Sequence, residues 1–155
     1  MAGVRDFPDE QLLAECRIET FRGPGPGGQK RNKTSSGIRI THSGSGVSAI
    51  ATESRSQARN RTAALRRLRV RLALEIREAW NNQKVSLKIS RRSEEYPKTI
   101  GLVLDALCES GWSVSGAAKL LATTTGQISR FINGDEKVLA EVNRQREQAG
   151  LKKLG

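Results

Sequence analysis

The sequence is poor in cysteine, histidine and aromatic residues. It has two cysteines, Cys16 and Cys108, which form no Cys-x-x-Cys pair, and one histidine, His42. Cysteines this far apart with a single histidine do not match a zinc site or a Cys-His nucleophile pair. We interpret both thiols as reduced core residues of a cytosolic protein, and we expect no bound metal or cofactor.

Long apolar runs are also missing. No stretch approaches the roughly 18 apolar residues of a membrane span, and the N-terminus has no signal-peptide pattern. We therefore expect neither a membrane span nor export, and a cytoplasmic location. A length of 155 residues allows one domain, or one domain and a small second one.

The basic charge is concentrated in one part of the chain. The 27 lysines and arginines exceed the 16 acids and give a formal net charge of +11. Residues 22–71 hold twelve of these cations and a single acid, Glu53, whereas the remainder balances. Such segregation predicts phosphate binding with a strong salt dependence. The alternative is a solvated basic face that serves solubility alone.

A loop rich in glycine and proline, GPGPGGQ at residues 23–29, precedes the basic run KRNK at residues 30–33. Glycine costs backbone entropy and proline removes a donor, so this segment cannot form a packed core. Two adjacent glycines let the backbone approach a ligand closely, and Gln29 then presents an amide side chain. The flanking cations indicate that the ligand is polyanionic.

Several sequence strings together resemble the peptidyl-tRNA hydrolase domain of the class I peptide chain release factors. They are GPGGQ at 25–29, NKT at 32–34, IRITH at 38–42, RSQ at 55–57, and Asn60 followed by Ala64 and Leu65. The resemblance covers about residues 16–78 and keeps the family's order and spacing. The chain departs from the family at Lys30 and Arg31, where His-Val is common, and in an extra Gly-Pro step before Gly25.

The resemblance implies ribosome-dependent hydrolysis of the ester that joins a peptide to tRNA, with Gly27, Gly28 and Gln29 as the catalytic residues. The implied partners are the ribosome with its rRNA, peptidyl-tRNA, and a methyltransferase that methylates the equivalent of Gln29 in the family. About twenty residues before the loop cannot hold a codon-reading domain. The resemblance therefore implies the short, codon-independent members that rescue stalled ribosomes, and we expect a monomer.

The first half predicts a small antiparallel sheet. Residues 16–22, 38–42 and 47–52 alternate as strands do, residues 43–46 suit a turn, and residues 9–14 and 31–36 could form short helices. His42 shares a strand face with Ile38 and Ile40. We expect a packed or cap-bonded histidine rather than a catalytic base, because no serine or aspartate stands in triad relation to it.

The period becomes helical from Arg55 to about Trp80. One apolar stripe comprises Leu65, Leu68, Leu72, Ile76 and Trp80. Seven arginines lie within residues 55–71, and we expect Arg59, Arg66 and Arg69 to point away from the stripe and to contact phosphate. The alternative is an arginine-rich face that serves solubility only. The expected RNA-binding residues are Lys30, Arg31, Asn32, Lys33, Arg39, Arg55, Gln57, Arg59, Asn60, Arg66 and Arg69.

The second half predicts a basic linker around a short strand at 85–89, followed by a helix from Pro97 to Ser110. Residues 113–121 and 125–132 with a turn between them resemble a helix-turn-helix, and Asp135 can cap a last helix. This unit would offer Gln127, Ser129 and Arg130 to a groove of rRNA, mRNA or DNA. A packing or protein-docking module is an equally open interpretation.

These patterns predict an α+β fold. A small antiparallel sheet holds the loop and a long basic helix packs on it, and a small all-α, helix-turn-helix-like unit follows. The expected domains are residues 1–80 and 96–155, with a linker at 81–95. The competing hypothesis for function is a non-catalytic RNA- or DNA-binding protein in which the helix-turn-helix dominates.

Overall fold

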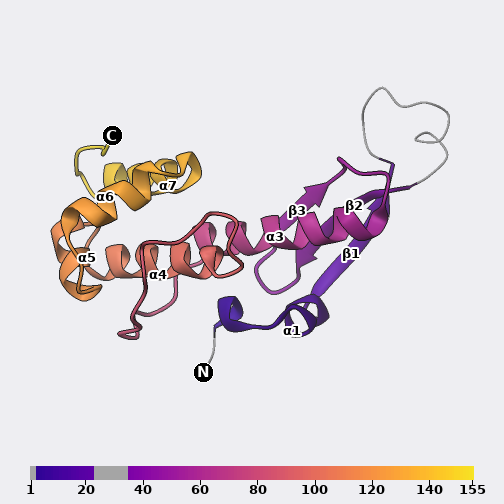
Figure 1. The fold of residues 1–155 in the computed structure, drawn as a ribbon, viewed down its shortest axis with the longest axis horizontal. Coiled ribbons are helices and arrows are strands. Elements are labelled where there is room, and N and C mark those ends of the chain that lie inside the picture. The colour runs from indigo at the N-terminus through magenta and orange to yellow at the C-terminus, as the bar shows by residue number, and fades with distance from the viewer. Residues whose placement is uncertain (1–2, 23–34) are drawn as a thin grey trace. The chain divides into compact units, whose positions relative to one another are not determined.

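The computed structural model describes residues 3–22 and 35–155 and has the predicted α+β fold (Figure 1). Its chain divides into two compact units, Met1–Leu72 and Ala73–Gly155. The domain bounds 1–80, 81–95 and 96–155 remain a prediction. The elements are η1 (Val4–Asp6), α1 (Asp9–Ala14), β1 (Cys16–Phe21), β2 (Gly37–His42), β3 (Ser48–Ala51), α3 (Gln57–Glu75), α4 (Tyr96–Glu109), α5 (Val114–Leu120), α6 (Thr125–Asn133) and α7 (Glu136–Gln148).

The first unit contains an antiparallel sheet in the order β1-β2-β3. Cys16 lies opposite His42 and Phe21 lies opposite Gly37, so β1 and β2 pair along their whole length. The β2–β3 turn contains Gly46, whose φ of 75° favours glycine and whose N–H donates to the His42 carbonyl at 2.8 Å. The predicted hairpin is confirmed.

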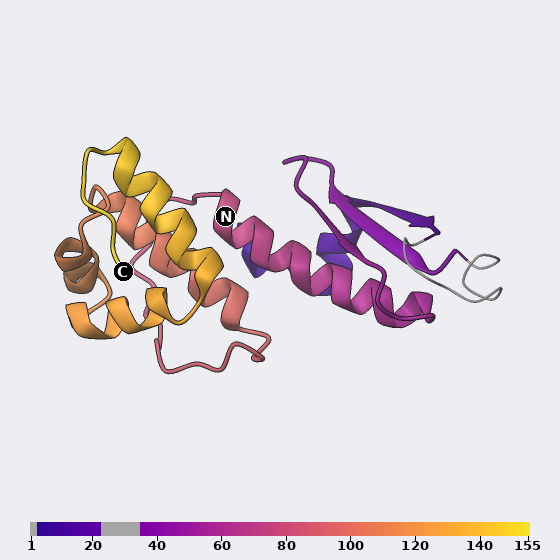
Figure 2. The same cartoon turned by 90° about the horizontal axis from the view of Figure 1, so that it is seen from above.

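Helix α3 lies along the sheet (Figures 1 and 2). Its apolar side chains Leu65, Leu68 and Leu72 are buried, as are Ile38 and Ile40 on β2. This confirms a long basic helix packed on a small sheet, in which a helical stripe and a strand face bury one another.

Helix α3 ends at Glu75, five residues before the end expected at Trp80. The carboxylate of Asp105 on α4 is 2% exposed and accepts hydrogen bonds from the Arg77 guanidinium at 3.3 Å and from the Glu78 backbone N–H at 3.0 Å. A buried carboxylate needs such donors. The chain after Glu75 therefore bonds to α4 instead of continuing the helix, and Ile76 is only half-buried.

The second unit contains the expected helix, α4, whose side chains from Tyr96 to Leu107 are nearly all buried. Proline occupies its first turn, where the missing N–H costs nothing. Gly111 follows the helix with a φ of 67°, and the Trp112 N–H returns to the Leu107 carbonyl at 2.7 Å. This glycine stop was predicted.

Side-chain caps define the next three helices. The Ser113 hydroxyl accepts from the Gly116 N–H at 3.1 Å before α5, and the Thr124 hydroxyl accepts from the Gln127 N–H at 3.1 Å before α6. Asp135 accepts from the Lys137 N–H at 2.9 Å and caps α7. These bonds satisfy helix-end donors and confirm the predicted helix-turn-helix pattern and the last helix.

Two further short elements were expected, a strand at 85–89 and a helix at 31–36. Residues 85–89 form no strand, because the described part of the second unit contains no other strand with which they could pair. The helix expected at 31–36 lies mostly outside the described residues, and Ser35 and Ser36 are not helical. Among the described residues, no helix is long and apolar enough to cross a membrane.

Candidate functional site at the stem of the loop

The predicted catalytic loop lies outside the described residues, and the structure shows the stem from which it leaves the sheet. Strand β1 ends at Phe21 and β2 begins at Gly37, and these two residues are paired across the strands. The two arms of the loop therefore start side by side. The predicted site residues outside the described part are Gly27, Gly28, Gln29, Lys30, Arg31, Asn32 and Lys33.

The stem is closely packed at Gly37. A Cβ placed there would lie 2.9 Å from the Phe21 carbonyl oxygen and 3.1 Å from two of its ring carbons, so a larger residue would push the pair apart. The guanidinium carbon of Arg39 lies 5.4 Å from the centre of the Phe21 ring, and Arg39 also pairs with Glu19 at 3.6 Å. Arg39 thus holds the stem while part of its side chain stays exposed.

Two amide side chains at the start of α3 fasten the returning arm of the loop. Asn60 is 1% exposed, and its nitrogen donates to the carbonyls of Ser36 at 2.6 Å and Ser54 at 2.8 Å, while its oxygen accepts from the Ser54 N–H at 3.0 Å. The Gln57 amide donates to the Ser35 carbonyl. Asn60 therefore has a structural role here, and the RNA contact expected for it is not part of the site we propose.

Some arginines of α3 and of the segment just before it are exposed, whereas others are bonded to the rest of the fold. Arg55 and Arg59 are exposed, and so is Arg61, which is not among the expected RNA-binding residues. Arg69 is 19% exposed and donates to the Phe7 carbonyl at 2.8 Å and to Asp9 at 2.7 Å. Arg66 is half-buried. Arg69 thus ties the N-terminal segment to α3 instead of projecting from it.

A further arginine binds the edge of the sheet. Arg67 donates to the Ile50 carbonyl at 2.8 Å and pairs with Glu53 at 2.5 Å. This hydrogen bond lowers the pKa of Glu53 below its usual value. The one acid of the basic segment therefore neutralises an arginine that is already fixed by the fold.

His42 is 7% exposed and both ring nitrogens have partners. Nδ1 lies 2.7 Å from the Ser45 hydroxyl and Nε2 lies 2.9 Å from a Glu15 carboxylate oxygen. The ring joins the end of β2 to the segment before β1. This geometry confirms a packed, hydrogen-bonded histidine.

The two thiols are free but differ in environment. The Cys16 thiol donates to the Leu12 carbonyl at 3.1 Å, and burial, helped by the charge of Glu15, raises its pKa. Cys108 is exposed, so the prediction of a core thiol is wrong there, because it follows Leu107, the last buried residue of α4. The described residues contain no cluster of three His, Cys, Asp or Glu side chains that could hold a metal ion.

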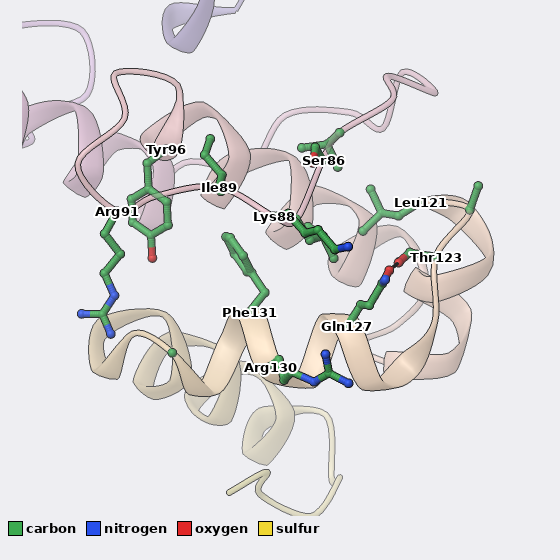
Figure 3. Close-up of a pocket in the computed structure, with 14 residues that line it drawn as sticks. Ser86, Lys88, Ile89, Arg91, Tyr96, Leu121, Thr123, Gln127, Arg130 and Phe131 are labelled. Atoms are coloured by element: carbon green, nitrogen blue, oxygen red, sulfur yellow. Dashed lines mark hydrogen bonds between the residues drawn. The ribbon is translucent and has the colours of Figure 1, made fainter.

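The three residues expected to contact nucleic acid from the second unit lie on α6. Gln127 and Arg130 are exposed and Ser129 is half-buried. Gln127 and Arg130 both line a cavity (Figure 3), whereas Ser129 does not. Two cations of that cavity, Lys88 and Arg91, were not predicted, since they belong to the segment interpreted as a linker.

Comparison with known proteins covers the loop, its stem and α3. Residues 12–100 match the family described as RF-1 domain, which is more than half of the chain. Peptide chain release factor 2 of Beutenbergia cavernae is 42% identical over 82 residues, 53% of this chain and 21% of that protein. Peptide chain release factor 1 of Dictyoglomus thermophilum is 53% identical over 58 residues, 37% of this chain and 16% of that protein. This chain thus spans about a fifth of the length of these relatives.

Proposed function

The chain belongs to the RF-1 domain family of the class I peptide chain release factors, and from this membership we propose that it is a ribosome-dependent peptidyl-tRNA hydrolase. The observation that carries the proposal is the family match, which spans the GPGGQ loop and the α3 residues that hold its stem. The paired ends at Phe21 and Gly37 and the amide of Asn60 support it, because a loop that enters another particle needs a fixed base.

The reaction joins a water oxygen to the ester carbonyl carbon, breaks the bond to the tRNA 3′ oxygen and leaves a proton on that oxygen. It needs a positioned water and stabilisation of the developing negative charge. We assign the stabilisation of this negative charge to the backbone N–H of Gln29. One preorganised donor of this kind contributes roughly 10²–10³ in rate. The Gln29 side chain limits the space to a water, and Gly27 and Gly28 supply the backbone geometry.

Phosphate contacts would hold the domain on rRNA. The exposed guanidinium groups of Arg55 and Arg59 lie at the start of α3, close in sequence to the amides that fasten the loop. Arginine binds phosphate with two parallel N–H donors and stays charged. Lys30, Arg31 and Lys33 would add contacts from the loop itself.

Rescue of stalled ribosomes is the setting that we propose for this activity. Under this proposal, the expected behaviour is activity on ribosomes with an empty A site rather than dependence on a stop codon. We also propose Gln29 as a methylation site, which mass spectrometry of its peptide checks.

A second candidate function is nucleic-acid binding without catalysis. The observation that favours it is the helix-turn-helix arrangement of α5 and α6 with both N-caps formed. A protein of this kind would keep sequence-selective binding after deletion of residues 23–29 and would release no peptide. The two functions therefore predict opposite results in a release assay.

The decisive variant is Gln29→Ala, with Gly28→Ala beside it. We expect peptide release from ribosomes carrying peptidyl-tRNA to fall by about 10²-fold or more, while ribosome association stays close to that of the unchanged chain. Release is measured on truncated mRNA and on mRNA with a codon in the A site, and association is measured by co-sedimentation.

Gln11→Ala is the matched control, because Gln11 is an exposed glutamine on α1. It should leave both release and association unchanged. Equal loss of release and association in Gln29→Ala would argue against a catalytic loop. No release by the unchanged chain on any ribosome would reject the proposed function.

A further inference from the structure

The second unit contains a cavity of about 480 Å³, which is within the usual range of roughly 300–1,000 Å³ for small-ligand sites. Figure 3 shows Gln127, Arg130 and Phe131 on α6 along one side, and Ser86, Lys88 and Ile89 of the extended segment along the other. The cavity therefore lies over the side of α6 that carries Gln127 and Arg130, two of the residues expected to contact nucleic acid.

The rim of the cavity is cationic. Lys88, Arg91 and Arg130 are all exposed, and no acidic residue is among the lining side chains. The Gln127 amide oxygen accepts from the Thr123 hydroxyl, and the amide nitrogen is the donor group of this side chain. This charge and donor pattern suits an anion that accepts several hydrogen bonds, such as phosphate.

The floor of the cavity is apolar. The rings of Tyr96 and Phe131 pack on each other with their centroids 5.9 Å apart, and Ile89 and Leu121 add aliphatic surface. The nearby carboxylate of Asp135 has both oxygens engaged, one by the Tyr96 hydroxyl at 2.8 Å and one by a backbone N–H. The site thus joins an apolar floor to a positive rim, as a nucleotide requires.

We propose that this cavity binds one nucleotide of single-stranded RNA, with the phosphate at the cationic rim and the base or sugar over the apolar floor. The site is distinct from the loop and does not depend on peptide release. A duplex is a poorer fit, because the extended segment with Lys88 lies opposite α6 across the cavity, whose volume of about 480 Å³ is that of a small-ligand site. Single-stranded RNA can insert one nucleotide without displacing that segment.

The test is a titration of the full-length chain with a fluorescent five-nucleotide RNA of mixed sequence, followed by anisotropy. The variant Lys88→Glu with Arg130→Glu reverses two rim charges. The control Lys119→Glu with Lys137→Glu makes the same change in net charge at two exposed residues outside the cavity. We expect the rim variant to bind about tenfold or more weakly than the control variant, since its phosphate contacts become repulsive.

Localisation of the ligand gives a second, independent measurement. In ¹H–¹⁵N NMR spectra, adenosine monophosphate should shift the amide signals of Gln127, Arg130 and Phe131. Equal binding by the two variants, or shifts confined to α3, would overturn the proposal. Tighter binding of a duplex through the same cations would overturn the proposal in favour of double-stranded nucleic acid. Displacement of the RNA by a glutamate-rich peptide that binds more tightly would overturn it in favour of a protein ligand. The Gln29→Ala chain should bind the RNA normally, so failure here is separable from failure of the release activity.

Discussion

The two compact units use their polar side chains for different purposes. In Met1–Leu72, arginines and amides make bonds between segments that are distant in sequence, as Arg69 does with Phe7 and Asn60 with Ser36. In Ala73–Gly155, many polar bonds are local caps, such as those of Ser113 and Thr124. The second unit also has long-range bonds of this kind, such as that from the Glu78 N–H to Asp105, but three of its helices begin at local side-chain caps.

This difference changes how the basic charge should be interpreted. The surplus cations of residues 22–71 first suggest a uniform RNA-binding surface. The structure uses Arg67 and Arg69 to hold backbone carbonyls, and leaves Arg55 and Arg59 exposed. A count of charges thus overstates the surface that is available for phosphate.

The largest effect should come from the core of the second unit. Leu104 is fully buried in α4, and Leu104→Ala should reduce the free energy of unfolding of this unit by about 2–5 kcal/mol, because a cavity remains. Hydrogen exchange measured by NMR should show faster exchange in α4 to α7 and little change in the sheet. Leu120→Ala, at a leucine that is 36% exposed, is the control. Equal acceleration in both units would show that they unfold as one and would break the comparison.

An intermediate effect is expected at the loop stem. Asn60→Ala leaves the Ser36 and Ser54 groups without their buried partner and should cost about 1–3 kcal/mol of stability. Peptide release, measured below the unfolding temperature, should fall more than ribosome association, because the loop loses its fixed base. Asn133→Ala, at an exposed asparagine, should change neither. Parallel loss of release and association would mean that Asn60 acts through stability alone.

The smallest effects on stability and binding are expected for two arginines of α3, Arg69, which is bonded within the fold, and Arg59, which is exposed. Arg69→Ala removes bonds to Phe7 and Asp9 and should lower stability by about 1 kcal/mol. Arg59→Ala should leave stability nearly unchanged and should reduce the salt dependence of ribosome binding by about one phosphate contact. Thermal unfolding and binding at several salt concentrations provide the two measurements. The reverse pattern would contradict our division of the arginines.

The hairpin and the starts of several helices could be predicted because their sequence signals are local. The period-two alternation of residues 38–42 and 47–52, with Gly46 at the turn, is enough to specify a hairpin. Caps such as Ser113, Thr124 and Asp135 mark helix starts within a few residues of the bonds they make. The family resemblance likewise depended on a contiguous loop and a spaced RSQ string, both of which are visible without coordinates.

The features that could not be predicted depend on contacts between residues far apart in the sequence. The end of α3 depends on Asp105, about 30 residues later, and the burial of Asn60 depends on two carbonyls from separate segments. The cavity over α6 requires an extended segment that periodicity alone suggested was a strand.

By itself, the sequence determined the hairpin and most helices of this protein, the segregation of its charge and its membership of the release factor family, because these depend on residues close together in the chain. The tertiary structure decided which arginines are exposed, which amide fastens the loop and where a cationic cavity opens. These outcomes depend on which backbone groups meet across the fold, and a buried donor or acceptor takes whatever partner the packing brings to it.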